Sequence, residues 1–207
     1  MTKTMLVIGA GPGISLAATQ RFVREGFAVV PASRNPDKLA SDIADLTAKG
    51  AVVTTEVLDA ADGAAVSALV TKYADKLDVL FFNAAVMRFG PTIDAVPDDT
   101  LDADLHVGLS SGLRAIKAAL PGMTARGGGT ILLTGGSVAD DPHAAGLTLS
   151  IAKAGLQTAA KALFEPLKDQ NINIAVQNVG AAVAPGSDVS HEIADAFWTL
   201  YAAPKDQ

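Results

Sequence analysis

The fold is decided near the N-terminus, by the stretch Leu6-Val7-Ile8-Gly9-Ala10-Gly11-Pro12-Gly13-Ile14-Ser15-Leu16. An apolar run leads into three glycines, and the glycines open into a helical pattern. This order predicts a strand, a tight turn and a helix whose free N–H groups and positive end suit a phosphate. Gly9 permits the sharp turn, and Gly11 and Gly13 let a pyrophosphate approach the backbone. Taken alone, the turn also fits an ordinary strand-to-helix loop.

Composition narrows the class of protein. The chain has 207 residues, of which 49% are hydrophobic, and this predicts a single domain over residues 1–207. A net charge of −6 argues against nucleic acid as a partner, and the absence of cysteine excludes disulfides and thiolate chemistry. The apolar run near the N-terminus is too short for a signal peptide or a membrane span. We therefore expect a cytoplasmic protein with no membrane partner and no metal site.

Strand-like and helix-like segments alternate along the whole chain. Six strands are expected: the first over residues 6–8, the second from near 27 to its end within 31–35, and the others near 52–57, 78–82, 131–134 and 172–179, with helices between them and a last helix near 188–201. Parallel strands joined by helices predict an α/β fold with a doubly wound parallel sheet, a Rossmann-type three-layer sandwich. The long helical region near 98–126 carries a stripe expected to face the core: Leu101, Leu105, Leu109, Leu113, Ile116 and Leu120.

The end of the second strand predicts the type of cofactor. Ser33 lies 20 residues after Gly13, where a dinucleotide fold places the residue that contacts the adenosine ribose. An NAD site would have a carboxylate there. Ser33 and Arg34 offer a hydroxyl and a guanidinium instead, which suit the 2′-phosphate of NADP. Asn35 is expected to cap the next helix, with Pro36 in its first position.

Other strand ends add candidates at the same edge of the sheet. Two roles are open for Asp59, which can bind an adenine amino group or cap the helix that begins near Asp62. Asn83 and Ala84 follow the fourth strand, where small residues let a loop pass close to a cofactor. Ser137 follows the fifth strand. Because ligands bind beyond the carboxyl ends of parallel strands, we expect these residues to cluster.

These motifs together resemble the short-chain dehydrogenase/reductase family over about residues 4–183. Gly9-Ala10-Gly11-Pro12-Gly13-Ile14-Ser15 is similar to its TGxxxGIG turn, and Ala32-Ser33-Arg34-Asn35 to its NADP-preferring strand end. Leu58-Asp59 is similar to its adenine-site aspartate, and Phe82-Asn83-Ala84-Ala85 to its NNAG motif. The resemblance implies a cofactor site for NADP(H) made of Gly9, Gly11, Gly13, Ile14, Ser33, Arg34, Asp59, Asn83, Ala84 and Lys153.

The catalytic part of the resemblance is incomplete. The family uses a serine, a tyrosine and a lysine, the last two spaced YxxxK, together with an asparagine on the long helix. Ser137 matches the serine and Lys153 the lysine, but the residue four positions before Lys153 is Leu149. Counting back from Pro121 places the asparagine position on Gly108. The tyrosine that transfers the proton is therefore missing.

Another group would have to replace it. His143 lies in the loop between Ser137 and the helix of Lys153, and histidine side chains titrate near neutrality, so we name His143 as a catalytic candidate beside Ser137 and Lys153. The C-terminal region also lacks the family's long substrate-covering insertion, and this predicts a shallow pocket or one completed by a partner chain.

Two functions follow from the sequence. The first is an NADP(H)-dependent oxidoreductase that acts on a small carbonyl, alcohol or activated double bond with a non-standard proton donor. The second is an inactive NADP(H)-binding sensor or structural protein of the same fold. The resemblance also implies a homodimer or homotetramer, in which the helices near 98–126 and 147–167 pair with their copies.

Overall fold

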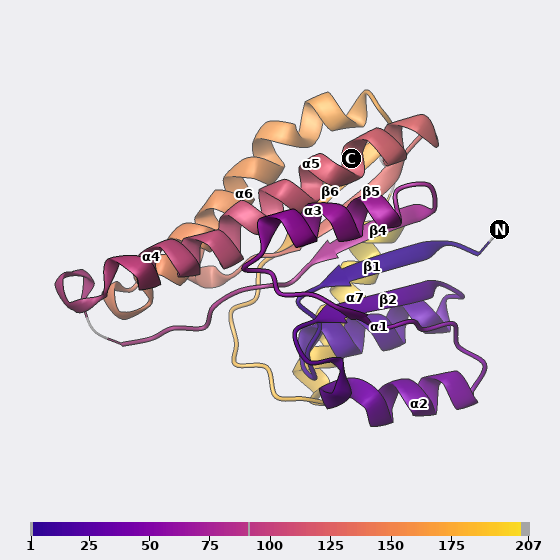
Figure 1. The fold of residues 1–207 in the computed structure, drawn as a ribbon, viewed down its shortest axis with the longest axis horizontal. Helices are drawn as coiled ribbons and strands as arrows, with labels where there is room; N and C mark the ends of the chain where they lie inside the picture. The colour runs from indigo at the N-terminus through magenta and orange to yellow at the C-terminus, as the bar shows by residue number, and fades with distance from the viewer. Residues whose placement is uncertain (1, 91, 204–207) are drawn as a thin grey trace.

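The computed structural model describes residues 2–90 and 92–203. One sheet of six parallel strands runs through the molecule in the order β3-β2-β1-β4-β5-β6, with helices on both of its faces (Figure 1). The strands are β1 (Thr4–Ile8), β2 (Ala28–Ser33), β3 (Glu56–Val57), β4 (Leu77–Phe82), β5 (Gly129–Thr134) and β6 (Ile172–Gln177). The predicted α/β fold with a doubly wound parallel sheet is confirmed.

The helices lie between the strands as the pattern predicts. The α-helices are α1 (Ile14–Arg24), α2 (Ala40–Ala48), α3 (Gly63–Lys72), α4 (Asp98–Leu105), α5 (Ser111–Ala125), α6 (Leu147–Lys168) and α7 (Asp188–Ala202). Short helical turns are η1 (Pro36–Leu39), η2 (Ile93–Ala95), η3 (His106–Ser110), η4 (Ser137–Ala139) and η5 (Ala144–Gly146). Among these turns η3 is a π-helical turn, which joins α4 to α5 into one continuous helical region.

Successive strand residues point to opposite faces, which divides the core into two layers. Leu6 and Ile8 of β1 belong to the cluster that packs under α3, α5 and α6. Met5 and Val7 belong to the cluster that packs under α1 and α7. Both faces of the central strands are therefore buried, as their continuous apolar sequences indicate.

Three expectations about the elements are wrong. Leu113 was expected in the core, but it is 42% exposed on α5. Asn35 precedes η1 without a side-chain capping bond, although Pro36 does occupy the first position of that turn. The third strand was expected over residues 52–57, but only Glu56 and Val57 form β3, with an isolated bridge at Val53.

Candidate active site

The glycine-rich turn joins β1 to α1 as expected. Gly9 has φ +85°, and a Cβ on it would lie 2.5 Å from the backbone nitrogen of Ala84. Only glycine tolerates both this positive φ and this close approach. Its lack of a Cβ therefore lets β1 pack directly against the loop after β4. A Cβ on Gly11 would meet no atom within 4 Å, so space is open on that side of the turn.

The N-terminus of α1 is open for a ligand. Gly13 caps α1 without a side-chain hydrogen bond, and the N–H groups of Gly13, Ile14 and Ser15 have no partner among the described residues. Ser15 is buried at the start of α1. Its hydroxyl accepts a hydrogen bond from the N–H of Gly11 at 2.8 Å, and this bond fixes the turn. The turn thus fits the diphosphate of a dinucleotide, because unpaired amides at a helix N-terminus bind anions.

The end of β2 presents the groups expected to select NADP. Arg34 is exposed, and its guanidinium forms no ion pair or hydrogen bond with the described residues. The carbonyl oxygen of Ser33 accepts from the N–H of Leu58 at 3.0 Å, which brings the strand end beside Asp59. Ser33, Arg34 and Asp59 therefore lie at neighbouring strand ends.

The second role that the sequence left open for Asp59 is wrong. The helix α3 is capped by Asp62, whose carboxylate accepts from the N–H groups of Ala64 and Ala65 at 2.9 Å. Asp59 instead accepts from the N–H of Ala61 at 2.9 Å in the preceding turn. It remains exposed beside the end of β2.

A chain of hydrogen bonds connects the ends of β1, β4 and β5. The Asn83 amide nitrogen donates to the carbonyl oxygen of Gly9 at 3.1 Å. The Thr134 hydroxyl donates to the Asn83 side-chain oxygen at 2.9 Å. The Lys153 ammonium in turn donates to the carbonyl oxygen of Thr134 at 2.6 Å. The structure therefore brings together Gly9, Asn83 and Lys153, which the sequence predicts for one site.

Lys153 is held at this place by close packing. Its side chain is only 6% exposed, and a Cβ on Gly136 would lie 3.4 Å from the Lys153 Cγ. Burial lowers its pKa from 10.5 to about 8, because an ammonium loses hydration there. No other group contributes to this shift.

Ser137 lies in the turn η4 after β5, which packs against α6, the helix of Lys153. Its N–H donates to the carbonyl oxygen of Val179 at 3.0 Å, and a Cβ on Gly180 would lie 3.6 Å from the Ser137 Oγ. The hydroxyl forms no hydrogen bond with the described residues, so it is free to bind a substrate oxygen. His143 is exposed in the loop before η5 and also makes no hydrogen bond with the described residues.

Two positions near Lys153 carry groups that cannot transfer a proton. Leu149, one helical turn before Lys153, is 4% exposed. Gly108 lies in the π-helical turn η3, and a Cβ there would be 2.9 Å from the Cβ of Ala152. This contact places Gly108 against the residue before Lys153. An asparagine at position 108 would require α6 to shift.

One ion pair, between a buried aspartate and a half-exposed arginine, was missed by the sequence reasoning. Arg88 donates to both carboxylate oxygens of Asp104, at 2.8 and 3.1 Å, and the Thr148 hydroxyl donates to Asp104 at 2.9 Å. Asp104 is 3% exposed, and the Arg88 guanidinium holds its pKa below the usual range. The three residues join the loop after β4 to α4 and α6. The only sequence signal was an aspartate inside a helix with apolar neighbours.

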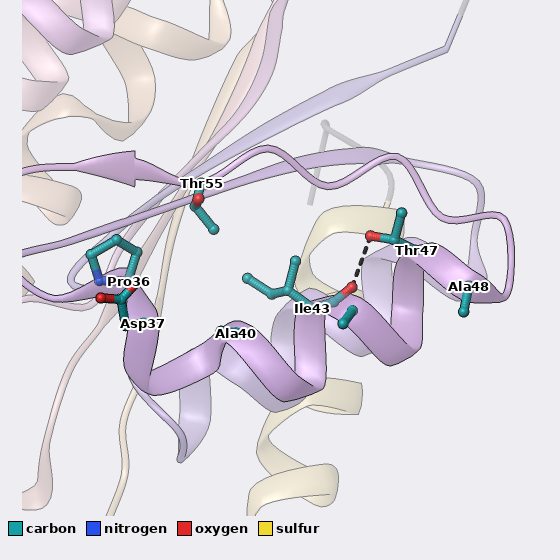
Figure 2. A pocket seen from close by; sticks show the side chains of 8 residues that line it. Pro36, Asp37, Ala40, Ile43, Thr47, Ala48 and Thr55 are labelled. Carbon is teal, nitrogen blue, oxygen red and sulfur yellow. Dashed lines mark hydrogen bonds between the residues drawn. The ribbon is translucent and has the colours of Figure 1, made fainter.

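A groove of about 510 Å³ lies elsewhere, between α2 and the segment before β3. Pro36, Ile43 and Thr55 line it, and the side chain of Ile43 points toward Thr55 (Figure 2). No residue of α2 is buried, so this helix stands away from the sheet. None of the lining residues belongs to the strand-end cluster, so we do not assign the groove to the site.

Two further kinds of site, a metal cluster and a membrane span, are absent from residues 2–90 and 92–203. No group of three or more histidine, aspartate or glutamate side chains in this part of the chain is arranged to hold a metal ion. Within the same ranges no helix has the length and apolar character needed to cross a bilayer.

Comparisons with known proteins agree with the fold and with the family resemblance. The short chain dehydrogenase family matches residues 3–194. Dehydrogenase/reductase SDR family member 4 of Bos taurus is 29% identical over 175 residues, which cover 83% of this chain and 63% of that protein. Oxidoreductase UcpA of Escherichia coli strain K12 is 30% identical over 193 residues, 89% of this chain and 68% of that one. The chain thus spans about 63% of the length of the bovine relative.

Solved structures share the same architecture. A short-chain dehydrogenase from Rhodopseudomonas palustris superimposes with a TM-score of 0.89 at 26% identity, covering 99% of this chain and 94% of that one. A metagenomic short-chain oxidoreductase in complex with NADP has a TM-score of 0.90 at 24% identity, covering 99% and 93%. With a family match over nearly the whole sequence, the chain belongs to the short-chain dehydrogenase/reductase family.

Proposed function

We propose that this protein is an NADP(H)-dependent oxidoreductase that acts on a small carbonyl, alcohol or activated double bond without a tyrosine proton donor. The observation that carries the proposal is the open N-terminus of α1, where the amides of Gly13, Ile14 and Ser15 have no partner among the described residues. The exposed Arg34 at the end of β2 supports NADP over NAD, because a guanidinium suits a 2′-phosphate. The metagenomic structural neighbour is in complex with NADP, which also supports NADP as the cofactor.

Each residue of the site has a separate task in this proposal. A nicotinamide nucleotide supplies or accepts a hydride when bound. The amides at the start of α1 hold its diphosphate, and Lys153 holds the nicotinamide ribose. The free Ser137 hydroxyl binds and orients the substrate oxygen, while Asn83 fixes the loop after β4 by its bond to Gly9.

Calorimetry with NADP⁺ and NAD⁺ tests the part of the proposal that concerns the cofactor. We expect NADP⁺ to bind more tightly, and Arg34→Leu to weaken it by about 10- to 100-fold, since a hydrogen bond to a charged group contributes about 1.5–3 kcal/mol. Arg24→Leu, which removes an exposed arginine at the end of α1, is the matched control. Tighter binding of NAD⁺, or no binding of either nucleotide at millimolar concentration, would contradict the proposal.

A second candidate function is favoured by the residues around Lys153. Leu149 and Gly108 stand where the family has its tyrosine and asparagine, and neither can transfer a proton. The protein would then bind NADP(H) as a sensor or structural partner without turnover. NADPH consumption measured against a panel of aldehydes, ketones and enones separates the two functions, provided that nucleotide binding has been established first.

We also propose that the protein acts in the cytoplasm as a homodimer or homotetramer. Leu113 on α5 and Ile151 on α6 are large apolar residues with 42% and 45% of their surface exposed. A second copy of the chain packed on these two helices would cover them. Sedimentation equilibrium tests the assembly, and Leu113→Asp together with Ile151→Asp should yield a monomer.

A further inference from the structure

The two tyrosines of the chain are bound away from the candidate site. The Tyr73 hydroxyl donates to Glu56 at 2.6 Å, and burial raises the pKa of Tyr73 to about 12. The Tyr201 hydroxyl accepts from Lys3 at 2.7 Å, just before the start of β1 and so at the opposite edge of the sheet from Ser137. Neither phenol is available to replace the tyrosine missing at position 149.

Lys153 of α6 packs against the short turn that carries Ser137. The Lys153 Nζ lies 2.6 Å from the carbonyl oxygen of Thr134, the last residue of β5, and Ser137 follows three positions later. Gly136 lies between them with the Lys153 Cγ packed against it. The ammonium and the free hydroxyl therefore both lie at the carboxyl end of β5, where ligands of parallel sheets bind.

No acidic group neutralises Lys153. Titratable residues on the elements packed around it make no hydrogen bond or ion pair with it: Asp104, His106, Asp140 and His143. Its one hydrogen bond among residues 2–90 and 92–203 is to a neutral carbonyl oxygen. Burial without a counter-charge lowers its pKa to about 8, so the ammonium is the predominant form at neutral pH and gives up its proton more readily than an exposed lysine does.

We propose that Lys153 is the proton donor of this site, and that it protonates the oxygen of a carbonyl substrate held by Ser137. This inference rests on the proposed function and replaces His143 as the donor. His143 is exposed and its side chain makes no hydrogen bond with the described residues, whereas Lys153 is buried and bonded at the strand end. The family resemblance alone gives the lysine a supporting role beside a tyrosine.

The proposed step balances in atoms and electrons. The substrate carbonyl carbon gains a hydride, whose source is the reduced nicotinamide nucleotide of the proposed function. The π-electron pair of the C=O bond moves to oxygen, and the oxygen takes a proton as one N–H bond of Lys153 breaks. The substrate becomes an alcohol, and the neutral Lys153 amine regains its proton from water.

A pair of substrates separates proton donation from ribose binding. A ketone needs a proton when it is reduced, but a preformed N-alkyl iminium ion of similar shape becomes a neutral amine without one. With NADPH and substrate saturating, we expect Lys153→Met to slow ketone reduction by about 10²- to 10⁴-fold, the usual range for a lost general acid. In the same variant, the rate of iminium reduction should fall by less than about one tenth of the factor by which ketone reduction falls. Lys161→Met, an exposed lysine two turns further along α6, is the matched control.

Several outcomes would overturn this assignment. Equal losses for both substrates would mean that Lys153 only positions the nucleotide. Loss of ketone reduction in His143→Ala, with Lys153→Arg and Lys153→Met still active, would assign the proton to the histidine. If the wild-type protein binds NADPH and reduces the iminium ion, the proposed function stands whatever the ketone result. If it reduces neither substrate, the proposed function fails and this inference fails with it.

A readout without nucleotide is also available. In ¹³C-lysine NMR of the free protein, one Cε resonance should titrate near pH 8 and disappear in Lys153→Met. In the activity assay, ketone reduction should fall above that pH while iminium reduction does not. A Lys153 resonance that titrates like those of the exposed lysines would contradict the proposal.

Discussion

The Lys153 Nζ lies 2.6 Å from the carbonyl oxygen of Thr134 and has no carboxylate partner to offset its burial. Its pKa falls from 10.5 to about 8, so between these values the unfolded chain binds the proton that the folded chain has lost. The free energy of unfolding should therefore rise with pH across this window, relative to a variant without the amine. Between pH 7 and pH 10, the free energy of unfolding of the wild type should increase by about 2 kcal/mol more than that of Lys153→Met.

Urea unfolding of both proteins at several pH values measures this difference. The comparison with Lys153→Met cancels the titration of the other lysines and the tyrosines, which both proteins share. Parallel stability curves across the window would show that Lys153 keeps an ordinary pKa in the folded state.

Most of the fold could be predicted because local patterns dictate it. The six strand segments are apolar, the turns between them carry glycine or proline, and parallel pairing follows from the alternation with helices. The third strand was the main error, and Pro31 explains it. Val29 bonds to Val52 and Thr54, so Pro31 occupies the next position that should donate to the third strand, and proline has no N–H. The ladder is interrupted there, leaving only Glu56 and Val57 as β3.

The site could be predicted only where its residues belong to a short motif, in which a few positions of sequence fix their spacing. The turn at Gly9 and the positions of Ser137 and Lys153 follow from short spacings. The salt bridge between Arg88 and Asp104 joins two segments 16 residues apart, and no periodic pattern marks it. The exposure of Leu113 depends on what packs against α5, which helical periodicity alone does not determine.

Gly9 and Gly11 should respond differently to the same substitution. Gly9→Ala puts a Cβ 2.5 Å from the Ala84 nitrogen at φ +85°, so we expect a loss of at least about 2 kcal/mol in the free energy of unfolding. Gly11→Ala meets no atom within 4 Å, so its stability should change by less than about 0.5 kcal/mol. Its affinity for NADP⁺ should nevertheless fall, because the methyl group occupies the space expected for the diphosphate. Unfolding titrations and calorimetry on both variants test this, and unchanged NADP⁺ affinity in Gly11→Ala would place the diphosphate elsewhere.

Thr148 should stabilise the loop after β4 through Asp104. The Thr148 hydroxyl donates to a carboxylate that is 3% exposed, and a hydrogen bond to a charged group contributes about 1.5–3 kcal/mol. Thr148→Val keeps the shape of the side chain, so its loss of unfolding free energy at pH 7 should fall in that range. Thr158→Val, an exposed threonine on the same helix, is the control.

The pH dependence of the Thr148→Val effect provides its own check. Arg88 and Thr148 lower the pKa of Asp104 below its usual 3.8, so their stabilising effect is complete above that value. It is lost as pH falls through the lower pKa of the folded state. The difference between wild type and Thr148→Val should therefore shrink in strong acid, and a difference that is independent of pH would show that packing alone is responsible.

Leu149 is the position at which a single substitution should add a proton donor. It lies one helical turn before Lys153 and is 4% exposed, so Leu149→Tyr places a phenol beside the ammonium at a cost of about 1–3 kcal/mol in stability from overpacking. General acids contribute about 10²- to 10⁴-fold in rate, but Lys153 already protonates the substrate in our proposal, so ketone reduction should rise only about 10- to 100-fold. Leu149→Phe has nearly the same volume without the hydroxyl, and it should show no gain. Steady-state rates of NADPH consumption with one ketone distinguish the three proteins. Equal rates in the tyrosine and phenylalanine variants would mean that the phenol does not reach the substrate oxygen, and that position 149 lies outside the proton path of this protein.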